Sequence, residues 1–181
     1  MCMALQTAPR TRAELLALPP DGCRHELIDG EHLVTPAPTY RHQNVLRRLH
    51  EVLLPHVRAH TLGAVFVGPA DLAFSEDEVL QPDLFLIPPR NPKPRSWEEI
   101  TTLLLVVEVI SPASALTDRE RKRRRYQRAG IPHYWIVDPE QRQVEVWHPD
   151  ATVGEVWRDT LIWPVPADSP LTIDLAQLFA D

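Results

Sequence analysis

The stretch LLLVVEVIS, residues 103–111, has the composition of a buried strand. A strand that is apolar on both faces lies inside a sheet with cover above and below it. This stretch nevertheless carries one carboxylate, Glu108. Burial of an ionised carboxylate costs several kcal/mol unless a cation, hydrogen bonds or a metal ion compensates it. The stretch therefore predicts a central strand on which Glu108 is either a structural ion-pair partner or a ligand.

Length and composition fit one domain over residues 1–181, in which residues 1–20 form an amino-terminal extension with a short helix. The chain has 181 residues, of which 44% are hydrophobic, enough for one full core but not for two comfortable domains. The formal net charge is −6. Since the surface as a whole does not attract nucleic acid or an anionic membrane, any site for a polyanion must be local.

The cysteines and the first residues suggest where the protein resides. Cys2 and Cys23 show neither a CxxC motif nor a paired spacing, so we expect no disulfide framework and no cysteine-rich zinc site. Charged side chains interrupt the apolar positions of the amino-terminal segment, which argues against a signal peptide or a membrane span. We therefore expect a soluble cytoplasmic protein with no membrane partner.

Hydrophobic periodicity and turn signals place the other elements around the central strand. Asp29-Gly30 suits a type I′ hairpin turn, Pro55 should kink or end a long helix, and Thr117 with Glu120 resembles a capping box. The predicted elements are a short helix in 10–19, a hairpin over 24–34, a helix over 42–57, strands in 63–75, 80–89 and 101–111, a helix over 118–129, a hairpin from 133–139 and 143–149, and a short helix in 171–181.

Two acids and a lysine are predicted to meet at one end of the sheet. Asp83 opens its strand, and Glu108 lies near the end of the next one. If these strands are antiparallel neighbours, the start of one lies beside the end of the other. Lys122 falls on one helical stripe with Asp118 and Tyr126, which would let it reach the acidic pair.

The choice of lysine at position 122 is unusual for this chain. Of 19 basic residues 17 are arginine, and only Lys93 and Lys122 are lysine. The run 119–125, RERKRRR, reads on spacing alone as a solvated helix face whose arginines pair with nearby acids. A compact ammonium at the inward position instead suits charge stabilisation or proton handling. Arg121 and Arg124 would then face solvent or a phosphate backbone as substrate-binding residues.

Two carboxylates and a lysine at a sheet edge suit metal-assisted hydrolysis of a phosphodiester bond. Carboxylate oxygens hold Mg²⁺ or Mn²⁺, the metal activates a water and binds a phosphoryl oxygen, and lysine orients that water or offsets developing charge. A buried Asp–Lys–Glu network that serves structure alone remains open as the alternative.

Several segments resemble the PD-(D/E)XK nuclease superfamily and, within it, a bacterial family of restriction-endonuclease-like proteins that was long a domain of unknown function. The resemblance runs from about residue 20 to the end. Its segments are QPDLFLI (81–87), VVEVISP (106–112), DRERKRRRYQRAGIPHYWIVDP (118–139), and HELIDGEHLVTPAP (25–38) with RHQ (41–43).

The resemblance implies an α/β (α+β) fold, in which helices flank a mixed sheet, and dependence on a divalent metal. It maps a catalytic set onto Asp83, Glu108 and Lys122, with the two acids as metal ligands. The superfamily motif places its lysine two residues after the acid, where this chain has Ile110. In this family the lysine lies on the following helix, which is where Lys122 stands.

Three further residues are secondary candidates. Glu26 and His42 occupy positions that in this family lie near the acidic centre, and each would be a supplementary metal or water ligand. Tyr126 shares the inward face of the helix with Lys122. A lone His or Glu of this kind is more often structural or solvated.

We expect a Mg²⁺- or Mn²⁺-dependent endonuclease that acts on DNA. The alternatives are a catalytically silent member that binds nucleic acid or a partner protein through the same fold, which the acidic net charge favours, and a purely structural role. The resemblance and the aromatic-rich second half of the chain also predict a homodimer, although these aromatic residues could equally fill the core.

Overall fold

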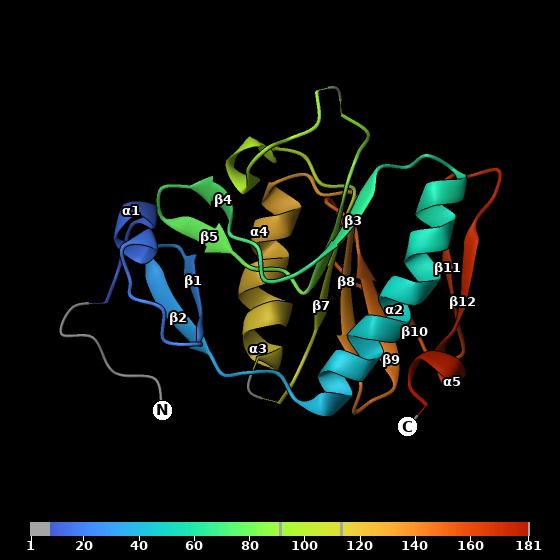
Figure 1. The fold of residues 1–181 in the computed structure, drawn as a ribbon. Coiled ribbons are helices and arrows are strands. Elements are labelled where there is room, and N and C mark those ends of the chain that lie inside the picture. The colour runs from blue at the N-terminus through green and yellow to red at the C-terminus, as the bar shows by residue number, and fades with distance from the viewer. Residues whose placement is uncertain (1–7, 91, 113, 181) are drawn as a thin grey trace.

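The computed structural model describes residues 8–90, 92–112 and 114–180, with helices and strands in an α+β arrangement (Figure 1). A 3₁₀ turn at Trp97–Glu99 precedes β7, and a π-helical turn at Asp118–Lys122 joins α3 to α4. In chain order the other elements are α1 (Arg12–Leu16), β1 (Arg24–Ile28), β2 (Glu31–Thr35), α2 (Tyr40–Ala59), β3 (Ala64–Val67), β4 (Leu72–Ser75), β5 (Glu78–Leu80), β6 (Leu84–Ile87), β7 (Leu105–Val109), α3 (Ala115–Thr117), α4 (Arg123–Arg128), β8 (His133–Asp138), β9 (Gln143–Trp147), β10 (Glu155–Trp157), β11 (Thr160–Trp163), β12 (Leu171–Asp174) and α5 (Leu175–Leu178).

A four-stranded antiparallel sheet in the order β2-β1-β5-β4 contains the predicted amino-terminal hairpin. Asp29 and Gly30 connect β1 and β2 and both have positive φ, 52° and 69°, as a type I′ turn requires. The short helix α1 begins with a capping box between Thr11 and Glu14 and packs Leu15 against this sheet. The predicted helix and hairpin are therefore confirmed.

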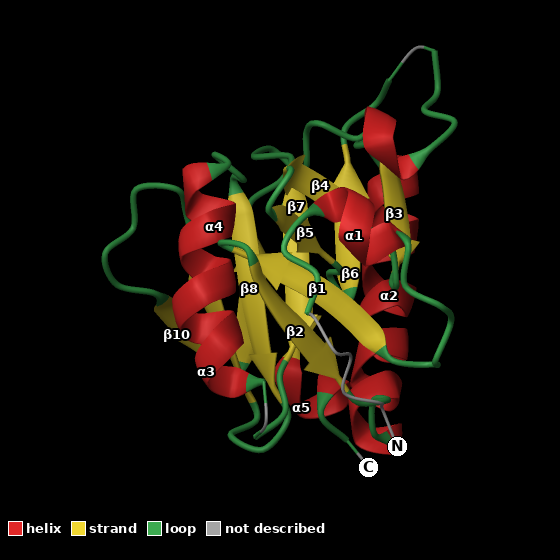
Figure 2. Cartoon of the chain, turned by 90° about the vertical axis from the view of Figure 1, so that its left-hand side faces the viewer, coloured by secondary structure: helices red, strands yellow, loops and turns green. Residues whose placement is uncertain are grey.

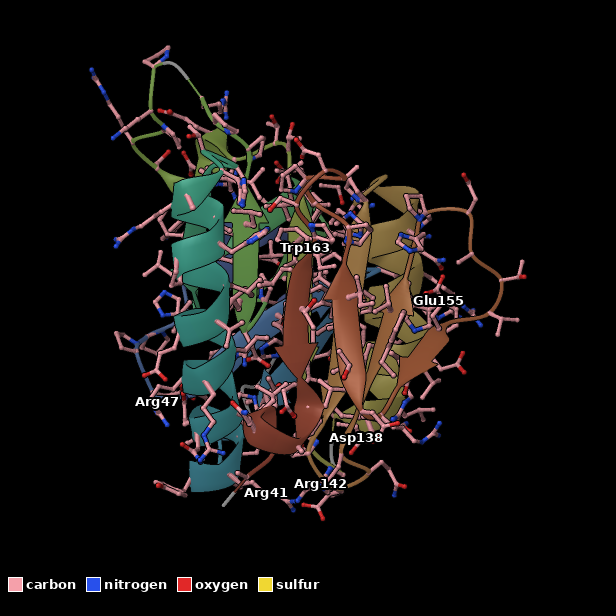
Figure 3. The ribbon with its side chains drawn as sticks, turned by 90° about the vertical axis from the view of Figure 1, so that its right-hand side faces the viewer. Arg41, Arg47, Asp138, Arg142, Glu155 and Trp163 are labelled. Carbon is pink, nitrogen blue, oxygen red and sulfur yellow. The ribbon has the colours of Figure 1, made fainter. Side chains whose placement is uncertain are left out.

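The main sheet is mixed, in the order β10-β9-β8-β7-β6-β3, with helices on both sides, as the resemblance predicted. β7 is an interior strand that pairs antiparallel with β6 and parallel with β8. Val107 packs in the core that α2, β11–β12 and α5 cover, whereas Val106 packs in the core beneath α4 and the small sheet. Figure 2 shows the side of α4 and the small sheet, and Figure 3 shows the side of α2 and β11. Because side chains alternate along a strand, Glu108 points to the side of α4.

Three predicted elements differ in the structure. The segment 63–75 is not one strand, because the chain breaks at Gly68-Pro69, and β3 and β4 belong to different sheets. Proline cannot donate to a ladder, and Gly-Pro marks a turn. Helix α2 continues through Pro55, since Leu53 and Val57 bury on the sheet on either side of it. Residues 171–181 begin with strand β12 before the short helix α5.

The helix after β7 begins earlier than predicted. It begins at Ala115, and Thr117 has helical φ and ψ without a side-chain cap, so the proposed capping box is wrong. Its end follows the prediction: Gly130 has a φ of 68°, and the amides of Gly130 and Ile131 donate to the carbonyls of Gln127 and Tyr126. This pair of bonds is a Schellman motif.

The expectation drawn from the cysteine pattern involves Cys2, which lies outside the described residues. The cytoplasmic location stays a prediction. Within the described part of the chain, none of the helices has the length and apolar character that a membrane crossing needs.

Candidate active site

Asp83 and Glu108 lie opposite each other at one end of the main sheet. Leu84 of β6 pairs with Val107 of β7 in an antiparallel register, so the residue before Leu84 meets the residue after Val107. Both acids are almost fully buried, with 5% and 2% of their surfaces exposed. The antiparallel pairing that the sequence predicted is confirmed.

Lys122 binds a group of three buried carboxylates. Its Nζ lies 2.9 Å from Oε1 of Glu26, 3.1 Å from Oε1 of Glu108 and 3.4 Å from Oδ1 of Asp118. The lysine reaches Glu108 from the π-helical turn, as the helical stripe predicted, and only 4% of it is exposed. The solvated-face interpretation is therefore wrong for Lys122.

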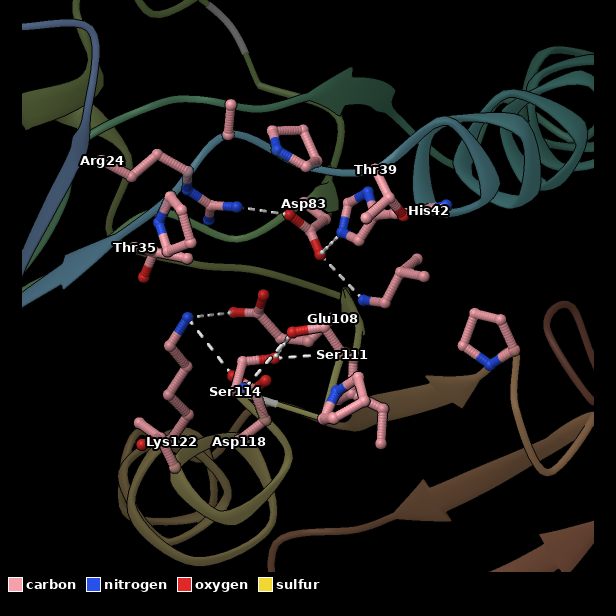
Figure 4. A pocket seen from close by; sticks show the side chains of 18 of the residues that line it. Arg24, Thr35, Thr39, His42, Asp83, Glu108, Ser111, Ser114, Asp118 and Lys122 are labelled. Carbon is pink, nitrogen blue, oxygen red and sulfur yellow. Dashed lines mark hydrogen bonds and ion pairs between the residues drawn. The ribbon is translucent and has the colours of Figure 1, made fainter. Parts of the chain in front are cut away.

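Asp83 accepts hydrogen bonds at both oxygens (Figure 4). Nη1 of Arg24 donates to Oδ1 at 2.6 Å, and the backbone N–H of Val109 donates to Oδ2 at 2.8 Å. Nε2 of His42, near the start of α2, lies 3.0 Å from the same Oδ2. Burial by itself would raise the pKa of Asp83, but the hydrogen bond to His42 and the charges of His42, Arg24 and Lys122 lower it to about 2. Asp83 is therefore a carboxylate at neutral pH.

The pKa of Glu108 is shifted in the opposite direction from that of Asp83. Burial raises its pKa well above the usual value, and the charges of Asp83, Asp118 and Glu26 add to this against the opposing charge of Lys122. Burial alone would lower the pKa of Lys122, but the surrounding acids raise it well above the usual value. Lys122 therefore stays an ammonium ion.

Negative charge exceeds positive charge in this buried cluster. Four carboxylates, those of Glu26, Asp83, Glu108 and Asp118, face two cations, Arg24 and Lys122. Leaving His42 aside, the formal excess is two negative charges, and a protonated His42 would reduce it to one. An uncompensated buried charge is costly, so the cluster favours either protonation of an acid or a further cation.

The cluster opens into a pocket of about 540 Å³. Residues from β1 through the start of α2 form one wall, and the segment after β7 with the π-helical turn forms another. Of the secondary candidates, Glu26 and His42 line the pocket. Tyr126 lies beneath it, where its hydroxyl donates to Oε1 of Glu108 at 3.1 Å.

The two predicted substrate-binding arginines differ in position. Arg121 binds the amino-terminal hairpin, with Nη2 2.8 Å from the carbonyl oxygen of Ile28 and Nη1 2.9 Å from Glu31. Arg124 is an exposed side chain that pairs with Glu120 at 3.0 Å. Arg124 therefore faces solvent as predicted, whereas Arg121 is tied to the hairpin.

The donor set suits Mg²⁺ or Mn²⁺ in charge and in atom type. Asp83 and Glu108 supply hard oxygen ligands, and the excess of negative charge in the cluster favours a bound cation. Among the described residues, however, no three or more His, Cys, Asp or Glu side chains are placed to hold a metal together. Since Mg²⁺ commonly binds through one or two carboxylates and keeps several waters, two protein ligands fit such an ion.

Two residues of the cluster were not singled out as candidates from the sequence. Arg24 could have been found because it lies two residues before Glu26 on a predicted strand, which puts both side chains on one face. Asp118 could have been found because it precedes Lys122 by four residues on the inward helical stripe.

Gly68 positions Asp83. Its N–H donates to the carbonyl of Asp83 at 2.8 Å, and a Cβ at this position would lie 2.3 Å from the carbonyl oxygen of Pro82. We expect Gly68→Ala to push this backbone away, with a loss of about 1–3 kcal/mol of stability and weaker binding of any ligand that uses Asp83. Gly130→Ala, where the added Cβ meets nothing within 4 Å, is the control that should destabilise the helix end without altering the site. Melting and ligand titration of both variants measure the difference, and an unchanged Gly68→Ala would contradict this role.

Comparison with known proteins identifies the family. The family model Uma2, described as "Putative restriction endonuclease", matches residues 12–175. A crystal structure titled as "a putative nuclease belonging to DUF820" from Anabaena variabilis has a similar fold, with a TM-score of 0.77 and 23% sequence identity over 94% of this chain and 98% of that one. The curated proteins contain no match. With more than half of its length matched by the family model, the chain belongs to the Uma2 family of restriction-endonuclease-like proteins, as the resemblance in its sequence predicted.

Proposed function

We propose that the protein is a nuclease that uses Mg²⁺ or Mn²⁺ to hydrolyse phosphodiester bonds in DNA. The observation that carries the proposal is the meeting of Asp83 and Glu108 at one pocket, with the ammonium of Lys122 3.1 Å from Glu108. Membership of a family whose model is described as "Putative restriction endonuclease" supports the nuclease class.

Each residue has a role that follows from its environment. Asp83 and Glu108 would hold the metal, which when bound lowers the pKa of a water and polarises a phosphoryl oxygen. Val109 and His42 fix the Asp83 carboxylate from one side. Lys122, with its pKa raised well above the usual value, holds its proton, so it donates hydrogen bonds and offsets developing negative charge instead of acting as a base.

The substrate must be recognised locally, because the net charge of −6 repels a polyanion in general. Arg124, with 67% of its side chain exposed, is one candidate for phosphate contact, and Arg121 would have to leave Glu31 to become another. The homodimer and the preference for DNA over RNA stay predictions.

A second candidate is a catalytically silent member that binds nucleic acid or protein through the same fold. It is favoured by the internal pairing of the acids, since Asp83 already holds Arg24 and Glu108 already holds Lys122. Binding of a divalent metal separates the two candidates.

We expect calorimetric titration with Mn²⁺ to reveal one site in the wild type that disappears in Asp83→Ala. The loss follows from removal of a carboxylate ligand whose low pKa keeps it ionised. The control is Asp138→Ala, which removes a buried acid that pairs with Arg119 at 2.8 Å. Mn²⁺ binding that survives in Asp83→Ala would place the metal elsewhere, and no binding in the wild type would favour the silent member.

A further inference from the structure

Arg24 is a cation placed directly on the carboxylate that the proposed function assigns to the metal. Its Nη1 donates to Oδ1 of Asp83 at 2.6 Å, and its Nη2 donates to the carbonyl oxygen of Gln81. Arg24 and Glu26 lie two residues apart on β1 and both line the pocket. The amino-terminal sheet thus contacts the main site through Arg24–Asp83 and Glu26–Lys122.

The two oxygens of Asp83 differ in how easily a metal could reach them. Oδ2 is bound by the backbone N–H of Val109, which β7 fixes in place, and by His42. Oδ1 is bound by Arg24, a long side chain that can change its conformation. A metal that binds Asp83 at Oδ1 would therefore lie beside the guanidinium of Arg24, and two cations at such close range repel each other.

The guanidinium of Arg24 is only partly satisfied in its present position. Its Nε is buried and has no hydrogen-bond partner among the described residues. A buried N–H without a partner is costly, so the lack of a partner at Nε offsets part of what the two hydrogen bonds of this guanidinium contribute. The contact with Asp83 is thus strong at Nη1 but leaves a penalty at Nε.

We propose that Arg24 is an internal counter-cation, which a divalent metal must displace from Asp83 before it can bind. The inference rests on the proposed function, because it takes Asp83 as a metal ligand. It goes further in assigning Arg24 as the residue that sets metal affinity: the contact Arg24–Asp83 and the contact metal–Asp83 exclude each other. In the metal-free protein Arg24 stabilises the fold, and in the metal-bound protein it does not.

The test is titration of Mn²⁺ into the wild type, Arg24→Met and Arg41→Met. Arg41 is the matched control because it lines the same pocket and carries the same charge, yet it binds Glu140 at 2.7 Å and the carbonyl of Pro139 instead of Asp83. We expect the Mn²⁺ dissociation constant to fall about tenfold in Arg24→Met and to change by less than about threefold in Arg41→Met.

Thermal melting gives a readout that is independent of cleavage. Without metal, Arg24→Met should melt below the wild type, because Asp83 is left buried with one cation fewer. With saturating Mn²⁺ the difference should narrow, because the variant binds the ion more tightly. If Arg24→Met does not fold, Arg24→Gln replaces it, since glutamine keeps an N–H donor and removes the charge.

The possible results separate the inference from the proposed function. Weaker or unchanged Mn²⁺ binding in Arg24→Met would overturn the inference and make Arg24 a residue that orients Asp83 for the metal. Equal tightening in Arg41→Met would overturn it as well, since the effect would then be one of general charge. Binding in Arg24→Met but not in the wild type would support the inference strongly. Absence of binding in all three proteins would overturn the metal site itself.

Discussion

Glu108→Gln is expected to abolish cleavage while leaving the fold as stable as the wild type or more stable. The amide can still accept the hydrogen bonds of Lys122 and Tyr126, which both go to Oε1. It removes one negative charge from a cluster in which burial and neighbouring acids already oppose ionisation of Glu108. Loss of a charged metal ligand should lower single-turnover cleavage of plasmid DNA about 1000-fold or more.

Melting curves with and without metal separate a metal ligand from a structural residue. In the wild type, Mg²⁺ at about 100 times its dissociation constant should add ~2.7 kcal/mol, or a rise of about 5–10 °C, and Glu108→Gln should lose this rise. Glu145→Gln is the matched control, since Glu145 is a buried acid of β9 in the same sheet that pairs with Arg119. If Glu108→Gln melts several degrees lower and keeps its metal response, Glu108 is structural.

Lys122→Arg is expected to lose most of the activity although it keeps the charge. The side chain is 4% exposed and its ammonium fits among three carboxylates at 2.9–3.4 Å. A planar guanidinium is larger and cannot act as a compact donor at the same point. We expect single-turnover cleavage in Mn²⁺ to fall about 100-fold or more. Lys93→Arg, at the other lysine of the chain, which is exposed, is the control and should change nothing.

For Lys122→Ala, the structure predicts a loss of stability that the sequence did not predict. From the sequence, lysine acts mainly on the transition state and is not a ligand, so its removal should lower activity by orders of magnitude and leave the metal affinity nearly unchanged. The structure shows that removal leaves three buried carboxylates without their shared cation, which should cost about 3–5 kcal/mol of stability. Full activity of Lys122→Arg would instead contradict the catalytic role of Lys122 and direct attention to His42.

The sequence predicted the positions of Asp83, Glu108 and Lys122 because two simple rules of secondary structure determine them. The end of one strand and the start of its antiparallel neighbour meet at one edge, which placed Asp83 beside Glu108. Positions four apart on a helix share a face, which placed Lys122 below them. The contributions of Arg24 and Glu26 depend on how the small sheet lies against the main one. No local pattern encodes that packing of two sheets.

The predictions for three elements were wrong because they depend on tertiary packing and on where the chain turns. One apolar run, 63–75, became two strands in two sheets because the chain turns at Gly68, where the backbone of Pro82 passes too close for a side chain. Pro55 did not end α2, because burial of that helix on the sheet outweighs one missing hydrogen bond. The helix before Lys122 began early and widened into a π turn, which propensity does not predict.

The contacts of the site join parts of the chain that are distant in sequence, and this has a consequence for the order of folding. Arg24 and Asp83 are 59 positions apart, His42 and Asp83 41, and Val109 and Asp83 26. Each contact closes a long loop, and closure of such loops must precede any gain from the contact. A nascent chain that ends before Val109 therefore lacks part of this set of contacts, whatever local structure it has formed. In the finished protein, exchange of the Val109 amide, which is tied to the Asp83 side chain, should report opening of the whole fold and not of one loop.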